Sequence, residues 1–241
     1  MKESLPALPM RGLIQVAGAL DFDEARMLLE EGVDQVGFPL RLTVHKEDLS
    51  EEDAVLIIRA LPSPMAAILI TYLTEHREIL ALCHKLGVRK VQVHSRISLR
   101  EARKLRESAP RFQIIKSLVV GDGNFPELVQ SVAELSPYVD AFITDTFDPE
   151  TGACGATGRT HDWEVSRKLV EISPRPVILA GGLNPENVRR GILRVLPAGV
   201  DVHTGVERPD GRKDRRLVRA FISEAREAFA EAEHMMRSRG K

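Results

Sequence analysis

The sequence has few aromatic residues, only two cysteines and no long hydrophobic run. Aromatic side chains make up 5% of the 241 residues, so we expect a core of aliphatic side chains. Cys83 and Cys154 lie far apart, which argues against a disulfide framework or a thiolate metal site. The first residues lack the apolar segment of a signal peptide, and no run of about 18 apolar residues occurs elsewhere. We therefore expect a cytoplasmic protein that does not bind membranes.

An excess of charge of one sign is also absent. Lysine and arginine number 34 against 35 aspartates and glutamates, and the isoelectric point is about 6.7. Nucleic-acid-binding proteins carry a basic face, which this balance does not predict. The length is close to the roughly 250 residues of a single-domain α/β barrel. We therefore expect a small-molecule ligand and no nucleic-acid partner.

Short apolar runs alternate with longer amphipathic stretches along the whole chain. The apolar runs are rich in Val, Ile and Leu, as in parallel strands buried on both faces. Eight such units without a break in composition predict one (β/α)₈ barrel over 1–241. Residues 1–10 and 233–241 are predicted to be peripheral to it. An open doubly wound sheet is the alternative fold. The predicted strands are Leu13–Ala17, Gln35–Phe38, Ala66–Ile70, Lys90–Val93, Gln113–Val119, Ala141–Asp145, Val177–Ala180 and Gly199–Val202.

Several predicted helices carry boundary signals. The stretches 23–32 and 74–87 each end on a glycine, which is typical of a helix C-terminus. The stretch 98–108 opens with a serine followed three residues later by a glutamate, a capping box. The stretch 184–196 begins with an asparagine cap and a proline in the first turn.

Two glycine-containing loops follow the last two predicted strands. Gly181-Gly182 follows the seventh strand, and Thr204-Gly205 follows the eighth. In a barrel of this type, phosphate commonly binds in these two loops, where bare backbone N–H groups face the ligand. Plain turn chemistry is the alternative for either loop alone. Together the loops favour a phosphate site.

The sixth predicted strand ends at Asp145, where a carboxylate can point into the barrel mouth. The Gly-rich stretch that follows is too long for a simple connector and suits a mobile lid. A carboxyl group under a lid can have a raised pKa and act as a general acid. The alternative for Asp145 is a cap or a loop hydrogen-bond acceptor. Asp148 fits a turn residue, and Asp162 fits a helix cap before Trp163.

Four segments together carry a resemblance to a known family. They read "KVQVH" (90–94), "DAFITDTFDPETG…GATGRTHDW" (140–163), "ILAGGLNPENV" (178–188) and "VDVHTGVERPDGRKD" (200–214). The sequence resembles phosphoribosylanthranilate isomerase from about residue 12 to 225. The resemblance implies a (β/α)₈ barrel without a cofactor that catalyses an Amadori rearrangement of an N-linked phosphoribose in tryptophan biosynthesis. The sequence leaves the oligomeric state open between a monomer and a homodimer.

The resemblance implies a role for each residue that matches a family motif. A general acid protonates the ring oxygen, the furanose opens to an iminium, and a base removes the C2 proton. The matching residues are Asp145 as the acid; Gly181, Gly182, Thr204 and Gly205 for the phosphate; and Gln92, His94 and Asp201 as further substrate contacts. Lys116 also stands at a family lysine, where a structural role is the alternative.

Two parts of the sequence depart from the family pattern. The family's first strand reads Lys-Ile-Cys-Gly, with the cysteine as base, whereas this chain reads Gln15-Val16-Ala17-Gly18. We expect Gln15 to contact substrate, but Ala17 cannot take a proton. The loop after the second strand, 38–50, lacks the family's arginine pattern, and we expect Arg41 to supply the cation, with His45 or Lys46 as alternatives.

Three residues are candidates for a substitute base. They are His45, His203 and Cys154; His203 stands where the family usually has serine, and Ser95 where it has glycine. Each candidate also has a non-catalytic interpretation. His45 would be a solvated loop residue, His203 a hydrogen-bonding group near the phosphate, and Cys154 a cysteine without a function. Cys83 is interpreted as a packing residue.

Three functional hypotheses follow. The first is an isomerase acting on the family substrate or, as a paralogue, on a relative of it. The second is a barrel that binds a phosphorylated sugar without catalysis. The third, another phosphate-binding epimerase or synthase, requires the match in the last strand to be accidental. Asp145 and the long Gly-rich loop favour the enzyme, because a binding protein needs neither.

Overall fold

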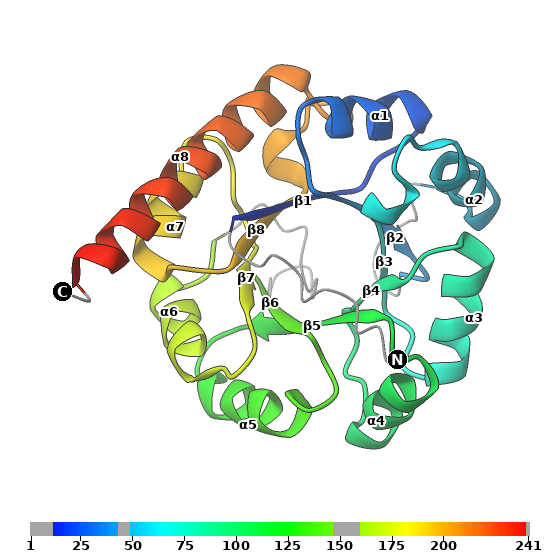
Figure 1. Ribbon diagram of the computed structural model, residues 1–241, viewed down its shortest axis with the longest axis horizontal. Coiled ribbons are helices and arrows are strands. Elements are labelled where there is room, and N and C mark those ends of the chain that lie inside the picture. Colours follow the sequence, from blue (N-terminus) through cyan, green and yellow to red (C-terminus); the bar gives the residue numbers. More distant parts are fainter. Residues whose placement is uncertain (1–11, 43–48, 147–159, 240–241) are drawn as a thin grey trace.

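The computed structural model describes residues 12–42, 49–146 and 160–239, and these residues contain a closed parallel barrel (Figure 1). Each strand pairs with the next along the chain, and the last pairs with the first, with Leu13 opposite Gly199. The strands are β1 (Leu13–Ala17), β2 (Gln35–Leu40), β3 (Ala67–Thr71), β4 (Lys90–Val93), β5 (Gln113–Val120), β6 (Ala141–Thr146), β7 (Val177–Leu179) and β8 (Gly199–Val202). The predicted (β/α)₈ barrel is therefore confirmed over the open sheet.

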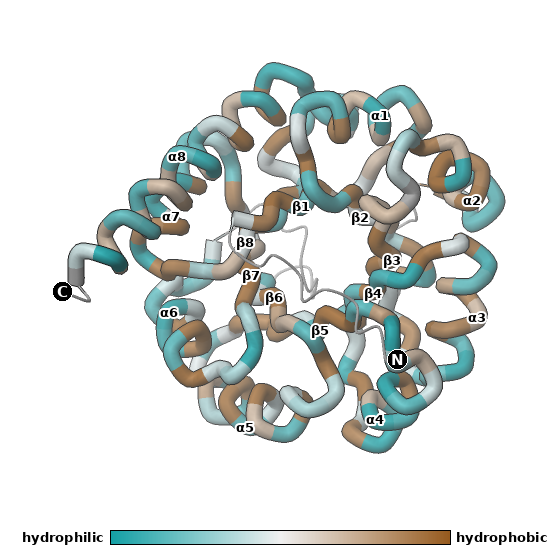
Figure 2. The backbone as a smooth tube through the Cα atoms, viewed as in Figure 1, coloured by the Kyte–Doolittle hydropathy of each residue, from teal (hydrophilic) through white to brown (hydrophobic). Residues whose placement is uncertain are grey.

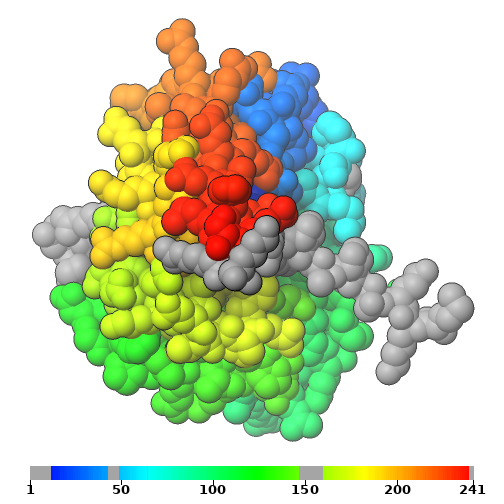
Figure 3. Space-filling model, turned by 60° about the vertical axis from the view of Figure 1, so that its left-hand side comes forward, coloured from blue at the N-terminus to red at the C-terminus, as the bar shows by residue number. Residues whose placement is uncertain are grey.

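Eight α-helices among the described residues surround the barrel (Figure 1). They are α1 (Phe22–Glu30), α2 (Glu51–Ala60), α3 (His76–Leu86), α4 (Leu99–Ser108), α5 (Phe125–Leu135), α6 (Trp163–Ile172), α7 (Val188–Val195) and α8 (Arg215–Arg239), with short 3-10 helices η1 (Pro64–Ala66) and η2 (Thr204–Val206). The long α8 packs between α7 and α1 and closes the ring of helices; Figure 3 shows its end at the surface. It includes most of the segment 233–241, which the sequence predicted to be peripheral.

The strands bury apolar side chains on both faces, as their composition predicts. Figure 2 shows that hydrophobic residues are frequent along the strands. A small cluster of aliphatic residues fills the barrel interior: Leu13, Ile68, Ile115, Ala141, Ile143, Ile178 and Ala180. A larger cluster lies between the strands and the helices and includes Phe38, Phe142 and Phe221. Cys83 belongs to this outer cluster, which confirms its packing role, and burial raises the pKa of its thiol to about 12.

The predicted helix boundaries are partly confirmed. Gly32 and Gly87 have left-handed backbones at the ends of α1 and α3, as expected. Ser98 accepts a hydrogen bond from the Glu101 backbone N–H at 3.2 Å. The carboxylate of Glu101, however, contacts His76 and Lys104, so the capping interaction found is the serine half of the predicted box.

Helix α7 begins at Val188 with Asn187 as its N-cap residue, three residues later than the predicted cap at Asn184. The Asn184 side chain accepts hydrogen bonds from the N–H groups of Glu186 and Asn187, and so caps a separate turn. Asn187 in turn accepts from the Asn184 N–H and donates to the Gly182 carbonyl. Asparagine side chains compete with backbone hydrogen bonding in this way, which delays the helix.

Candidate active site

Asp145 lies at the end of β6 and is buried. Its Oδ1 accepts a hydrogen bond from the Thr146 backbone N–H at 2.8 Å. Burial raises the pKa of Asp145 to about 7, and the Thr146 hydrogen bond partly opposes this rise. A carboxyl group that keeps its proton near neutral pH is suited to general acid catalysis.

A second buried carboxyl group, Asp201 on β8, lies close enough to feel the charge of Asp145. Burial and then the Asp145 charge raise the pKa of Asp201 to about 7, while a hydrogen bond from Gln15 and the charge of Lys213 lower it. Within the described part of the chain, its Oδ1 has no hydrogen-bond partner. The barrel mouth thus holds two buried carboxyl groups, and ionisation of Asp145 disfavours ionisation of Asp201.

A chain of polar side chains crosses the barrel interior from β1 to β5. Gln15 Nε2 donates to Gln92 Oε1 at 2.9 Å, and Gln92 Nε2 donates to Ser117 Oγ at 3.3 Å. His94 Nδ1 lies 2.9 Å from the same hydroxyl, and its ring lies 4.7 Å from that of Tyr72. Three predicted substrate contacts, Gln15, Gln92 and His94, are therefore brought together.

The loops after β7 and β8 pack directly against each other. Gly181 and Gly182 both have left-handed backbones, with φ of 91° and 61°. A Cβ on Gly205 would lie 1.8 Å from the carbonyl oxygen of Leu183, so only glycine permits this approach of the two loops. The predicted phosphate residues therefore lie side by side, and their role stays a prediction.

The imidazole of His203 lies over the end of β1. A Cβ on Gly18, whose φ is 78°, would be 2.2 Å from His203 Nε2. Glu207 Oε1 lies 3.4 Å from the same nitrogen. The Lys213 ammonium donates to Glu207 Oε1 at 2.5 Å and to the His203 carbonyl at 3.3 Å. The sequence analysis named His203 as a candidate base, but it did not predict the contacts with Gly18, Glu207 and Lys213.

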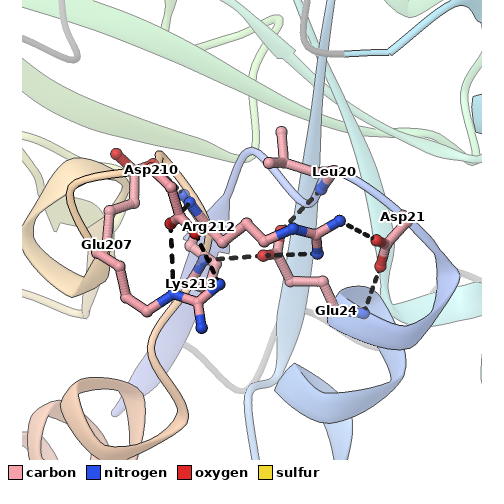
Figure 4. Close-up of polar contacts among 8 residues, drawn as sticks. Leu20, Asp21, Glu24, Glu207, Asp210, Arg212 and Lys213 are labelled. Carbon is pink, nitrogen blue, oxygen red and sulfur yellow. Dashed lines mark hydrogen bonds and ion pairs between the residues drawn. The ribbon is translucent and has the colours of Figure 1, made fainter.

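A polar clamp formed by Glu24, Arg212 and Lys213 ties the loop after β8 to the loop after β1 (Figure 4). The buried Glu24 carboxylate accepts hydrogen bonds from the backbone N–H groups of Leu20 and Lys213, both at 2.8 Å. The Arg212 guanidinium donates to Asp21 at 2.5 Å. The clamp fixes the loop that carries His203 relative to Gly18.

His161 is a site neighbour that the sequence did not single out. Its Nδ1 lies 3.0 Å from Thr146 Oγ1, and its Nε2 lies 2.5 Å from Ser166 Oγ. Burial lowers the pKa of His161 to about 4, so the ring is neutral at pH 7. A Cβ on Gly181 would be 2.2 Å from Thr146 Oγ1 and 3.2 Å from His161 Nδ1. No spacing rule in the sequence marks this contact, although Asp162 caps α6 as predicted.

The remaining predicted residues lie elsewhere or outside the described residues. Arg41 forms an ion pair with Glu51 on α2 at 2.5 Å. Lys116 is buried on β5, and its neighbours Ile115 and Ser117 face the barrel interior. Because side chains alternate along a strand, the Lys116 side chain points toward the helices. Its ammonium donates a hydrogen bond to the Ser117 carbonyl. The substrate contacts of Arg41 and Lys116 stay predictions. The structure does not describe residues 43–48 and 147–159, which include His45, Lys46, Asp148, Cys154 and most of the predicted lid of about 17 residues after Asp145.

Among the described residues, no cluster of His, Cys, Asp or Glu side chains has an arrangement that could hold a metal ion. In the same part of the chain, no helix has the length and apolar composition needed to cross a membrane.

The described residues do contain a closed barrel with protonatable carboxyl groups and two glycine loops at its mouth. This combination defines a (β/α)₈-barrel enzyme of the acid–base type.

Comparisons with known proteins agree with this class. The family described as N-(5'-phosphoribosyl)anthranilate (PRA) isomerase matches residues 14–224, and the chain belongs to this family. N-(5'-phosphoribosyl)anthranilate isomerase 2 of Methanosarcina mazei is 37% identical over 90% of this chain and 95% of its own.

Two solved structures are similar over 90% of this chain and 99% of theirs, each with 27% identity. One is phosphoribosyl anthranilate isomerase in complex with reduced 1-(o-carboxyphenylamino)-1-deoxyribulose 5-phosphate, with a TM-score of 0.73. The other describes monomers generated from the dimeric enzyme of Thermotoga maritima, with a TM-score of 0.72.

Proposed function

We propose that this chain is a PRA isomerase of tryptophan biosynthesis, an intramolecular aldose–ketose isomerase. Membership of the family over residues 14–224 supports the substrate and reaction. The observation that carries the chemistry is the buried Asp145 carboxyl group at the end of β6, whose pKa is raised to about 7. Opening of the furanose ring needs a proton donor, and this group holds its proton near neutral pH.

Asp145 donates its proton to the ring oxygen of the phosphoribose. The bond between C1 and this oxygen then breaks, the nitrogen lone pair forms the C1=N iminium, and the oxygen becomes the C4 hydroxyl. Asp201 lies nearby, and the charge that Asp145 acquires when it gives up its proton favours the protonated form of Asp201.

Gly181, Gly182, Thr204 and Gly205 form the proposed phosphate site. The contact between the two loops supports this assignment, because both sets of backbone N–H groups belong to one region. The complex of a related enzyme with a reduced phosphorylated product supports the same ligand class. The polar chain of Gln15, Gln92 and His94 is the proposed contact surface for the rest of the substrate, with Arg41 as a further candidate.

The first prediction tests Asp145. Asp145→Asn removes the proton donor, so we expect kcat with PRA to fall by about 10²–10⁴-fold. Affinity for reduced 1-(o-carboxyphenylamino)-1-deoxyribulose 5-phosphate, measured by calorimetry, stays within about threefold of the wild type. The control Asp23→Asn alters an exposed ion pair with Arg26 and leaves both values unchanged. Turnover by Asp145→Asn at the wild-type rate would remove Asp145 from the mechanism.

A barrel that binds a phosphorylated sugar without catalysis is the second candidate. Ala17 favours it, because its methyl group cannot accept a proton at the end of β1. This candidate predicts that the wild type binds the reduced product and does not turn over PRA. A paralogue with a changed substrate predicts neither binding nor turnover.

A further inference from the structure

Asp145, the proposed general acid, is held by the residue that follows it, and the inference drawn from this contact rests on the proposed function. Ile143, two residues before Asp145, belongs to the cluster inside the barrel, so strand alternation directs Asp145 inward as well. Thr146 then points the other way, toward the layer of helices. Its backbone N–H donates to Asp145 Oδ1 at 2.8 Å. A contact that fixes the Thr146 side chain therefore also fixes the peptide group that orients the acid.

His161 makes such a contact from the segment that leads into α6. Its Nδ1 lies 3.0 Å from Thr146 Oγ1, and its Nε2 lies 2.5 Å from Ser166 Oγ. Ser166 is fully buried on α6. In either neutral tautomer one ring nitrogen donates and the other accepts, and a hydroxyl group can take the complementary role at each. Both ring nitrogens are therefore paired, and the ring links α6 to the end of β6.

The charge state of the ring is constant near neutral pH. Burial lowers the pKa of His161 to about 4, against the opposing effect of the Asp162 charge. The pKa of Asp145 is raised to about 7 by burial, and Asp201 is the ionisable neighbour whose pKa responds to the Asp145 charge. A change in the neutral-pH behaviour of the site on substitution of His161 therefore reports on the carboxyl groups and not on the titration of the ring.

The same contact supports the loop after β7. Gly181 has φ of 91°, and a Cβ there would lie 2.2 Å from Thr146 Oγ1 and 3.2 Å from His161 Nδ1. The backbone of this loop therefore rests directly on the hydroxyl group and the ring. The pair formed by His161 and Thr146 thus lies between the proposed acid and one of the proposed phosphate loops.

We propose that His161 is a positioning residue for the general acid. The ring fixes the Thr146 hydroxyl group and, through the Thr146 peptide N–H, the carboxyl group of Asp145. It lies on the helix side of β6, so it orients the acid from behind and leaves the inward face of Asp145 to the substrate. Accurate placement matters here, because a displacement of about 1 Å can cost about 10²-fold in rate.

The test is steady-state turnover of PRA by the full chain carrying His161→Phe, which keeps an aromatic ring and removes both hydrogen bonds. We expect kcat to fall by about 10- to 100-fold. Affinity for the reduced product stays within about threefold of the wild type, because a ring still fills the space under Gly181. His84→Phe is the matched control: the same substitution at an exposed position of α3 keeps the wild-type kcat.

The pH profile of kcat separates positioning from a loss of stability. The hydrogen bond from the Thr146 N–H lowers the pKa of Asp145, so its loosening in His161→Phe raises this pKa. Because the protonated acid is the active form, the alkaline limb of the profile should move to higher pH. A variant that is merely less stable has a lower melting temperature and an unmoved limb.

Two further substitutions test the route through Thr146. Thr146→Val removes the hydroxyl group and keeps the backbone N–H, and we expect it to lower kcat as His161→Phe does. Combined with His161→Phe it should cost no more than the larger of the two single losses, since both remove one interaction. His161→Asn carries an amide group at the position of Nδ1, so it should retain several times the kcat of His161→Phe.

NMR titration of isotope-labelled aspartate carboxyl groups measures the pKa of Asp145 without turnover, with its signal identified by its loss in Asp145→Asn. A higher pKa of Asp145 in His161→Phe than in the wild type supports the positioning role. An unchanged pKa overturns it, and so do multiplicative losses of kcat in the double variant. A loss of affinity for the reduced product at unchanged kcat also overturns it, because His161 would then bind ligand directly. If the wild type does not turn over PRA, the proposed function fails, and the titration still decides the role of His161.

Discussion

Asp145 and Asp201 bring two carboxyl groups into one buried site, which is unfavourable for their ionised forms. Burial raises the pKa of each to about 7. An exposed aspartate in the unfolded chain ionises near pH 4. Between these values the folded state binds more protons than the unfolded state. The two groups therefore destabilise the fold increasingly as the pH rises from about 4 to about 7.

Asp201→Asn tests this linkage. Each proton retained by the folded state lowers the free energy of unfolding by about 1.4 kcal/mol per pH unit. Removing one of the two groups should therefore make the slope of the unfolding free energy against pH less negative by up to about 1.4 kcal/mol per pH unit between pH 5 and pH 7, as measured by urea denaturation at several pH values. Asp23→Asn should keep the wild-type slope. Equal slopes for Asp201→Asn and the wild type would show that Asp201 ionises normally in the folded protein.

Residue type and position indicated some site residues but not their contacts. Asp145 and the two glycine loops follow apolar strands directly, so they could be named from the sequence. The contact of His203 with Gly18 joins residues at opposite ends of the chain, and that of His161 with Thr146 spans an unpatterned loop. Neither has a local signal, because the fold alone brings these groups together.

At the scale of elements, the loops after β7 and β8 are joined by a close backbone approach. A methyl group on residue 205 would clash with the backbone carbonyl of Leu183. Because a backbone carbonyl cannot rotate away as a side chain can, the two loops would have to move apart. The same loops carry the proposed phosphate residues. We therefore expect the packing of these two loops and the affinity for a phosphorylated ligand to be coupled.

Gly205→Ala should weaken binding of the reduced product by at least about tenfold and cost about 1–3 kcal/mol of stability, the usual cost of overpacking. Calorimetry and urea denaturation measure the two effects. Gly32→Ala is the matched control: its backbone has φ of 92°, but a Cβ there meets nothing within 4 Å. It should cost about 1 kcal/mol with unchanged binding. Wild-type affinity in Gly205→Ala would exclude the loop contact as a determinant of the phosphate site.

At the scale of the whole molecule, α8 binds the segment around β1, which lies far from it in the sequence. Arg226 donates to the Gly12 carbonyl at 2.6 Å and to Asp34 at 2.8 Å, and Asp34 in turn accepts from the Ile14 N–H. Buried side chains continue along α8 as far as Ala232, whereas His234 and residues 236–238 are exposed. The stabilising part of α8 therefore ends near residue 233.

Deletion of residues 234–241 should lower the free energy of unfolding by less than about 1 kcal/mol, since it removes mainly exposed side chains. Deletion of residues 226–241 removes Arg226 and the buried Ala228 and Ala232, and should destabilise the protein by several times that amount. Urea denaturation of both truncations measures the difference. Similar losses for both would show that the end of α8 has a structural role that its exposure does not predict.

The sequence by itself determined a parallel sheet covered by helices, because aliphatic runs, each followed by an amphipathic stretch, bury both faces of such a sheet, and the number of eight units favoured the closed barrel over an open doubly wound sheet. It also determined where the glycine loops and Asp145 lie, because these follow the strands directly. Tertiary structure alone decided which groups meet: the two buried aspartates, His203 over Gly18, and the clamp from Glu24 to Lys213. The physical reason is that β1 and β8 become neighbours only when the barrel closes, and no local pattern encodes a contact across that closure.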